Sequence, residues 1–233
     1  MKKLFYKSFI LTIIFSILST YNAPAVENDF QLWAPIYLTV PIKEKFVGYF
    51  EINPRLGDNV TDVNQLRLRP ALGYKIKDNL IFYTGYAWAP GFVPKHRNEN
   101  RIWEQLELIS IFKKFQWLER FKFINQFRLE ERLIEDAGSM ALRGRYMLQI
   151  ERALDKNNLW TAVLYDKLYV NFYSVSKGPE GGFDQNRLYT GLRRKINDLL
   201  SIETGYQFQY IFGRGSLDNR INHAVVTSLY VNF

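Results

Sequence analysis

The sequence predicts an all-β protein: an antiparallel transmembrane β-barrel of about 10–12 strands, preceded by a cleaved signal peptide. Three observations predict it. An export signal opens the chain, apolar and polar residues alternate along many long segments, and the last segment has one apolar face ending in Phe233. Such features are typical of Gram-negative outer-membrane barrels, so we expect an outer-membrane location.

Residues 1–25 are the predicted signal peptide. Phe9–Leu18 is almost wholly apolar, Ala23–Ala25 provides a small-x-small cleavage site, and the n-region carries Lys2, Lys3 and Lys7. Residues 26–233 are then a single barrel domain. Without the three lysines of the signal, the formal charge of +8 falls to about +5.

The composition excludes several classes of protein. The chain has no cysteine, which excludes a disulfide framework, a thiolate metal site, a cysteine nucleophile and a lipid-modified N-terminal cysteine. Beyond the signal, no stretch approaches the ~20 apolar residues that a helical membrane span needs. No spacing of His, Asp and Glu resembles a metal site and no glycine loop suits a phosphate, so we expect neither metal nor cofactor.

Alternation with a period of two recurs along the chain. In the clearest segment, 201–212, six mainly apolar residues share one face, and Glu203, Gln207 and Gln209 share the other. Eleven strand-like segments are expected, at roughly 29–40, 44–56, 63–76, 79–89, 101–113, 118–133, 140–154, 158–173, 183–196, 199–212 and 220–233. Many exceed the 5 or 6 residues typical of soluble sheets and suit a tilted span of about 9–11 residues.

The predicted connections alternate between short turns and longer loops. Short turns fall at 42–45, 77–79, 113–117, 155–157 and 197–198, and longer loops at 57–62, 90–100, 135–139, 174–182 and 213–219. Barrels of this kind have short periplasmic turns and longer extracellular loops. The short turns, which are rich in lysine, are therefore expected to face the periplasm.

The first segment, 29–40, conflicts with the rest of the prediction. Eleven is an odd count, whereas single-chain bacterial barrels have even strand numbers. Counting 29–40 as a full span would also begin the barrel outside the cell, and Pro35 in its middle disfavours a fully paired strand. Either this segment does not span, or a turn escapes detection.

Tryptophan residues are expected at the two membrane interfaces. Trp88 and Trp103 flank the loop at 90–100, while Trp117 and Trp160 lie beside short turns. Two rims of Trp and Tyr would match the aromatic girdles of membrane barrels. The alternative is that these side chains belong to the core of a soluble β-sandwich.

The polar faces carry paired charges that would point into the lumen. In a barrel of about ten strands, side chains can meet across the interior, and opposite charges are expected to pair there. The predicted lumen network is Arg67, Arg69, Glu107, Arg128, Glu130, Arg132, Arg143, Arg145, Glu151, Arg187 and Glu203, with Glu51, Arg55 and Arg193 on the same faces. Charged side chains that fill the lumen argue against a wide pore. Three roles then remain for the lumen: a narrow selective path, a proton-sensitive gate, or a polar interior with no function beyond satisfying its own charges.

His223 is the one candidate catalytic residue of an outer-membrane lipid hydrolase. Ser228 is five residues away in the same strand, so the two side chains point to opposite faces and cannot form a dyad. Ser216 and Glu203 remain conceivable spatial partners. His96, in the loop Lys95–Arg97, is expected to be solvent-exposed. Basic strands with interleaved aromatics could suggest nucleic-acid binding, but the export signal and the interspersed glutamates argue against it.

Three groups of residues resemble a known family. They are Asp29–Trp33, Phe127–Arg132 followed by Leu142–Tyr146, and Phe183–Leu192 with Asn222 and His223. Together they resemble the domain of unknown function 2490 over nearly all of the mature chain. The resemblance implies an outer-membrane β-barrel without an assigned activity and supplies no catalytic residues.

The expected partners follow from this fold. They are outer-membrane lipids, and the barrel-assembly machinery that would read the C-terminal strand through Val225, Leu229, Val231 and Phe233. No nucleic acid is expected. The predicted function is an integral barrel with a charge-filled narrow lumen and a structural or narrow-path transport role. The alternatives are a lipid or lipopolysaccharide hydrolase centred on His223, and a soluble periplasmic β-barrel binding protein.

Overall fold

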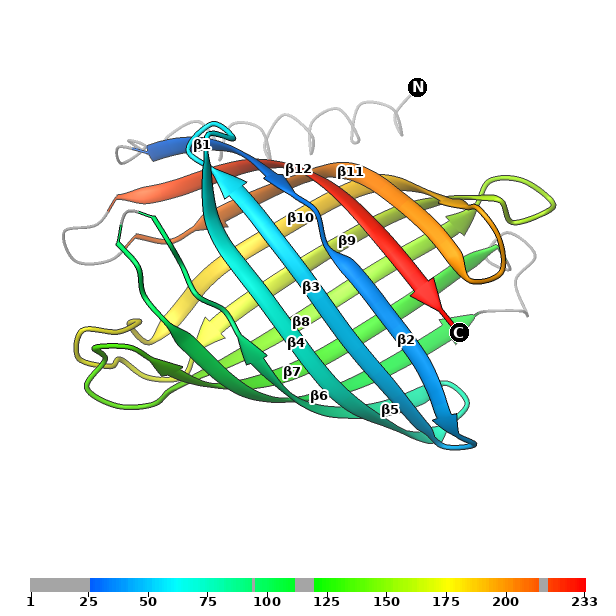
Figure 1. Cartoon of the computed structure of the whole chain (residues 1–233), viewed down its shortest axis with the longest axis horizontal. Helices are drawn as coiled ribbons and strands as arrows, with labels where there is room; N and C mark the ends of the chain where they lie inside the picture. Colours follow the sequence, from blue (N-terminus) through cyan, green and yellow to red (C-terminus); the bar gives the residue numbers. More distant parts are fainter. Residues whose placement is uncertain (1–25, 94, 112–119, 214–217) are drawn as a thin grey trace, which may run out of the picture.

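Twelve β-strands form one closed sheet in the computed structural model of the chain, which is a barrel of tilted strands (Figure 1). The structure describes residues 26–93, 95–111, 120–213 and 218–233. The predicted signal peptide at 1–25 and the predicted turn at 113–117 lie outside the described residues, as do Trp117 and Ser216. Within these ranges there is no helix long and apolar enough to cross a membrane.

The strand bounds follow the alternation in the sequence closely. The strands are β1 (Val26–Trp33), β2 (Ile36–Lys43), β3 (Phe46–Gly57), β4 (Asp62–Lys77), β5 (Leu80–Trp88), β6 (Glu99–Ile111), β7 (Phe121–Ile134), β8 (Ala141–Ala153), β9 (Trp160–Asn171), β10 (Gly182–Lys195), β11 (Leu200–Ile211) and β12 (Asn219–Asn232). The all-β barrel of about 10–12 strands is confirmed.

Consecutive strands pair as antiparallel neighbours from β2 through β12. The turns at 44–45, 78–79, 154–159 and 196–199 lie at one end of the barrel, called here the short-turn end. The chain also ends there, after β12. The connections at 58–61, 89–98, 135–140 and 172–181 lie at the opposite end, called the long-loop end.

The seam between the first and last strands is parallel. β1 pairs with β12 from Val26↔Asn219 to Trp33↔Val226, and β2 continues along β12 from Ile36↔Leu229 to Thr39↔Asn232. β1 and β2 thus occupy one position in the barrel, seen as the blue strands beside the red β12 in Figure 1. The barrel therefore has eleven strand positions.

The break between β1 and β2 has a local cause. Pro35 has no N–H, and Pro54 of β3 lies opposite the break. The carbonyl of Pro54 accepts a hydrogen bond from Ala34 N at 3.1 Å, but Pro54 has no N–H to return. One ladder bond is lost at this point, so the predicted segment 29–40 becomes two strands.

The expectation for segment 29–40 was wrong in one respect. An even strand number was expected, so that either this segment would not span or an undetected turn would restore the even count. Instead, the segment completes the wall at an odd count. An up-and-down barrel with an odd number of positions places its first and last strands in the same direction, and this requires the parallel seam.

The two faces of the wall differ in chemistry. Outward side chains are largely apolar and exposed, for example Phe127, Leu168 and Leu188. Inward side chains are mainly charged or amide-bearing, with one buried apolar cluster made of Trp33, Met147, Val163, Tyr165, Tyr189, Ala224 and Val226. The polar core and apolar exterior are the reverse of a soluble fold.

Trp103 does not contribute to an interfacial girdle. Its side chain is 1% exposed and lies inside the barrel, where the guanidinium of Arg128 stands 4.2 Å from its ring. The girdle prediction is therefore wrong for this residue. Trp103 lies two residues before the inward Gln105 on β6, and residues two apart on a strand have the same parity, that is, they face the same side of the wall. Trp160, by contrast, is exposed beside the turn at 154–159.

Candidate binding cavity in the barrel interior

The structure places all eleven residues of the predicted lumen network on the inner face of the wall. Nine are buried, and Glu107 and Arg132 are half-buried. They do not form one continuous network. They divide into an ion-paired group at the long-loop end, paired charges toward the short-turn end, and cations between them that have no carboxylate partner.

Glu130 is the centre of the group at the long-loop end. Its Oε2 accepts from Arg143 Nη2 at 2.5 Å, and Arg101 Nη1 lies 3.6 Å from the same oxygen. Glu99 accepts from Arg101 and Arg132, and Arg143 also binds Asp184 at 2.9 Å. We call this group the long-loop network; it consists of Glu99, Arg101, Arg128, Glu130, Arg132, Arg143 and Asp184.

Strand register brings the long-loop network together. Glu130 on β7 stands directly opposite Arg143 on β8. Arg132, by contrast, stands opposite another cation, Arg101 on β6, and both guanidinium groups bind Glu99, which lies two residues before Arg101 on the same face. Residues directly opposite on one face of an antiparallel pair are close enough to interact. Register therefore accounts directly for the pair of Glu130 with Arg143, and the shared carboxylate of Glu99 holds the two opposed cations together.

Three members of the long-loop network were not among the residues predicted from the sequence. Glu99 and Arg101 share the inward parity of Gln105, but the segment was expected to begin at 101, which left Glu99 in a loop. Asp184 has the outward parity. A register shift between Phe183 and Gln185 in the β9–β10 pairing lets its carboxylate reach the interior. Strict alternation carries no signal for that bulge.

Loops at the long-loop end are hydrogen-bonded to one another. Arg97 donates to the carbonyls of Glu135 and Lys177, at 2.9 and 2.6 Å, and Asn98 N donates to the Glu135 carboxylate. The hydrogen bond from the backbone N–H of Asn98 is the largest cause that holds the pKa of the exposed Glu135 carboxyl below its usual range, and the nearby His96 and Lys95 add to it. Three loops are tied together across this end.

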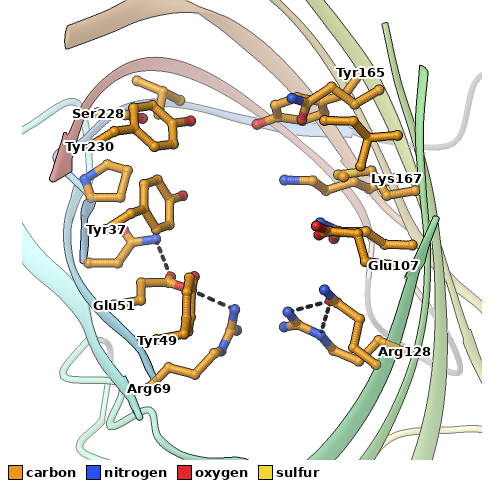
Figure 2. A pocket seen from close by; sticks show the side chains of 18 of the residues that line it. Tyr37, Tyr49, Glu51, Arg69, Glu107, Arg128, Tyr165, Lys167, Ser228 and Tyr230 are labelled. Carbon is orange, nitrogen blue, oxygen red and sulfur yellow. Dashed lines mark hydrogen bonds and ion pairs between the residues drawn. The ribbon is translucent and has the colours of Figure 1, made fainter. Parts of the chain in front are cut away.

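A second set of ion pairs lies toward the short-turn end. Arg193 binds Glu151 at 2.9 Å and Glu203 at 2.7 Å, and Lys122 lies 3.4 Å from Glu151. On the opposite wall, Arg69 binds Glu51 at 2.8 Å, a contact drawn as a dashed line in Figure 2.

A cavity of about 380 Å³ lies between these groups. Tyr37, Tyr49 and Glu51 line one side of it, and Glu107 and Lys167 line the other (Figure 2). The charged lining comprises nine cations (Arg55, Arg67, Arg69, Lys122, Arg128, Arg145, Lys167, Arg187 and Arg193) and four carboxylates (Glu51, Glu107, Glu151 and Glu203). The cavity is strongly positive.

Five of the lining cations have no carboxylate within ion-pairing distance among the described residues. We call Arg55, Arg67, Arg145, Lys167 and Arg187 the unpaired cations. Their partners are neutral. Arg145 donates to Gln105 and Gln126, Arg187 donates to Gln185, and the guanidinium of Arg55 lies 3.6 Å from the ring of Trp33.

Lys167 was missed by the sequence analysis. Its ammonium lies 3.8 Å from the ring centroid of Tyr165 and points into the cavity (Figure 2). Asp166 precedes it on the outer face. Because each face of β9 carries a charged residue, charge alone does not tell from the sequence which face points into the barrel. The outward Leu164, Leu168 and Val170 are the signal that could have assigned Lys167 to the interior.

His223 faces outward, as its parity predicts. Its Nδ1 is hydrogen-bonded to the hydroxyl of Tyr206 at 2.5 Å, and its ring packs edge-on against Phe208. Ser228 and Glu203 are buried on the inner face, on the other side of the wall. Neither can serve as a catalytic partner of His223. His96 is exposed beside Phe92.

No cluster of His, Asp and Glu within the described ranges could hold a metal ion. The charged interior is organised instead by guanidinium groups, carboxylates and amides. These groups can bind and orient an ionic ligand.

The fold and its interior define a closed β-barrel protein with a charged core. The chain belongs to the family described as "Protein of unknown function (DUF2490)", whose signature matches residues 30–221. The resemblance seen in the sequence is thereby confirmed. An uncharacterized protein of Methylorubrum extorquens is 28% identical over 212 residues, which cover 88% of this chain and 89% of that protein. No solved structure matches the chain.

Proposed function

We propose that the protein is an integral outer-membrane β-barrel with a narrow, charge-filled lumen, and that it provides a restricted path or chamber instead of a diffusion pore. The observation that carries the proposal is the inversion of the two faces. Apolar side chains cover the outside and charged side chains fill the inside. A closed barrel satisfies its backbone hydrogen bonds within the wall, which lipid requires.

The exterior supports a membrane environment over the soluble alternative. Large apolar side chains are exposed on neighbouring strands, among them Phe82, Leu106, Phe127, Leu168 and Leu188. Soluble monomers rarely expose contiguous apolar surface on this scale. Strands β3 to β12 have 9 to 16 residues, and about 9–11 are enough to cross a bilayer with tilt.

The interior supports a restricted path. The central members of the long-loop network (Glu99, Arg101, Glu130, Arg132 and Arg143) do not line the cavity. The cavity therefore stops at that network, and loops are tied across the end beyond it. Charged groups paired at 2.5–2.9 Å leave little room for a solute between them.

The orientation of the barrel in the membrane is part of the proposal. Barrels of this class carry short turns on the periplasmic side. We place the short-turn end, and the cavity that reaches it, in the periplasm. The outward Val225, Leu229 and Val231, with Phe233, would be presented to lipid and to the assembly machinery.

Planar-bilayer recording of the purified barrel across a range of pH tests this function. The expected result is insertion with small discrete conductance or none, which increases in the variant Glu130→Gln because the long-loop network loses its central carboxylate. Heat-modifiable mobility on gels and extraction only by detergent would establish insertion independently. Large, pH-independent conductance of the native barrel would refute the restricted path, and extraction without detergent would refute the membrane location.

The hydrolase alternative has no structural support beyond the presence of His223. Its test is direct. Lipid turnover by the native barrel that is abolished by His223→Ala would establish it, and turnover at the background rate would remove it.

A further inference from the structure

The charge of the cavity is unbalanced. Nine cations and four carboxylates line it, and three of these carboxylates already bind a cation within 3 Å. Burying a charge without a counter-charge is costly, and like charges gathered in one cavity add to that cost. A lining of this kind is best satisfied by an anion that is not part of the wall.

Buried donors within the cavity have no acceptor. Among the described residues, no hydrogen-bond partner is present for Nε of Arg67, Arg69 and Arg145 or for Nη1 of Arg128, and the four residues are only 5–8% exposed. Buried polar groups are nearly always hydrogen-bonded, so each such donor requires an explanation. Four guanidinium donors around one positive cavity point to an acceptor supplied from outside.

Neutral groups hold the unpaired cations in place. The carbonyl of Gln105 accepts from Arg128 and Arg145, at 2.7 Å from each Nη2, and Gln65 accepts from Arg55 and Arg67 at 3.2 Å. Amide acceptors position a guanidinium without neutralising it. The positive charge therefore remains available to a ligand. Carboxylates in place of Gln65 and Gln105 would neutralise it.

The cavity has the size and the access that a small ligand needs. Its volume of about 380 Å³ lies within the range of small-molecule sites. Its lining reaches the short-turn end at Asn232, which is exposed, and at Lys122, whose side chain is 39% exposed.

We propose that this cavity binds a small multivalent oxyanion, with Arg67, Arg145, Arg187 and Lys167 as its charged contacts. Planar guanidinium forks match the geometry of phosphate and carboxylate groups, and the ammonium of Lys167 adds a point charge. Tyr37, Tyr49 and Tyr165 offer ring surface to the remainder of the molecule. The site depends on the barrel interior alone and does not require that the barrel conduct.

Thermal unfolding of the barrel in uncharged detergent micelles tests the proposal. Inorganic phosphate and citrate are the two probes, and sodium chloride at matched ionic strength is the reference. A ligand that binds the folded barrel raises its melting temperature in a saturable manner. The expected result is such a rise with at least one probe, and the probe that acts assigns a phosphate or a carboxylate ligand.

The variants separate the cavity from general electrostatics. Lys167→Gln removes a side chain that has no hydrogen bond or ion pair within the described structure, so the fold is expected to persist. Arg145→Gln removes a buried guanidinium group. Arg152→Gln is the matched control, because Arg152 lies on the same strand and faces outward. We expect Lys167→Gln and Arg145→Gln each to weaken apparent affinity about tenfold or more, and Arg152→Gln to leave it unchanged.

Two results would overturn the proposal. One is a native barrel whose melting temperature responds to phosphate and citrate no more than to sodium chloride. The other is a saturable response that Lys167→Gln and Arg152→Gln retain equally, since the anion would then bind elsewhere. Either result is distinct from the conductance test and leaves the membrane assignment unaffected.

Discussion

Glu130 on β7 and Arg143 on β8 stand directly opposite each other on the inner wall, with 2.5 Å between Oε2 and Nη2. The glutamate is 2% exposed and also faces Arg101 and Arg128. One buried carboxylate thus serves three guanidinium groups. Its loss would leave the buried Arg128 without a carboxylate among the described residues, and would leave Arg143 and Arg101 with one carboxylate each in place of two.

Glu130→Gln is therefore expected to destabilise the barrel. Breaking a buried pair by removing one partner costs about 3–5 kcal/mol because the remaining charge stays buried. Denaturant unfolding in micelles measures this loss. Glu131→Gln is the control, because Glu131 follows in the chain and faces outward. Equal stability of the two variants would contradict a central role for Glu130.

The parallel seam can be tested by cross-linking. Val231 and Leu38 are register partners in the β12–β2 pair, and the native chain contains no cysteine. The double variant Leu38→Cys with Val231→Cys is expected to form a disulfide on mild oxidation, since partners in adjacent strands lie within bridging range. Val40→Cys with Val231→Cys is displaced by two residues and should cross-link poorly. The reverse preference would show a different closure.

Gly205 allows close approach between β10 and β11. A Cβ at this position would lie 2.3 Å from the carbonyl oxygen of Thr190 and 2.6 Å from the ring of Tyr189. Gly205→Ala should cost about 1–3 kcal/mol because backbone atoms must shift. Gly48→Ala, whose Cβ would meet nothing nearer than 3.5 Å, should be tolerated. Melting temperatures of the two variants give the comparison.

Asp155 organises the turn between β8 and β9. Its carboxylate accepts backbone hydrogen bonds from Trp160, Leu159 and Asn157, and these hold its pKa below the usual range, with Trp160 the largest cause. A lowered folded-state pKa stabilises the fold at neutral pH, and the stabilisation is lost as the pH falls through that lowered value.

Asp155→Asn should accordingly reduce stability at neutral pH. The difference from the native barrel should vanish in acid, once the native carboxyl is protonated. Stability measured across this range for both proteins is the check. A difference that stays constant with pH would show that the charge of Asp155 plays no part in the turn.

Alternation in the sequence was enough to predict the strands and most inward residues. Successive side chains of a strand point to opposite faces, so position in the alternation was enough to place the charged residues of β7 and β8 inside the barrel. Trp103 shows where residue type misleads. Tryptophan is typical of interfaces, but its parity placed it inside, against Arg128. Parity was the better guide because it is a property of the backbone.

The sequence by itself determined the class of fold, the strand bounds within a few residues and the charged character of the interior. Each of these depends on neighbours along one strand. Only the tertiary structure decided the parallel seam, the inward turn of Asp184 at a bulge and the separation of paired from unpaired cations. These features depend on the number of strands, on their register and on which residues of different strands meet across the sheet. No local pattern in the chain encodes them.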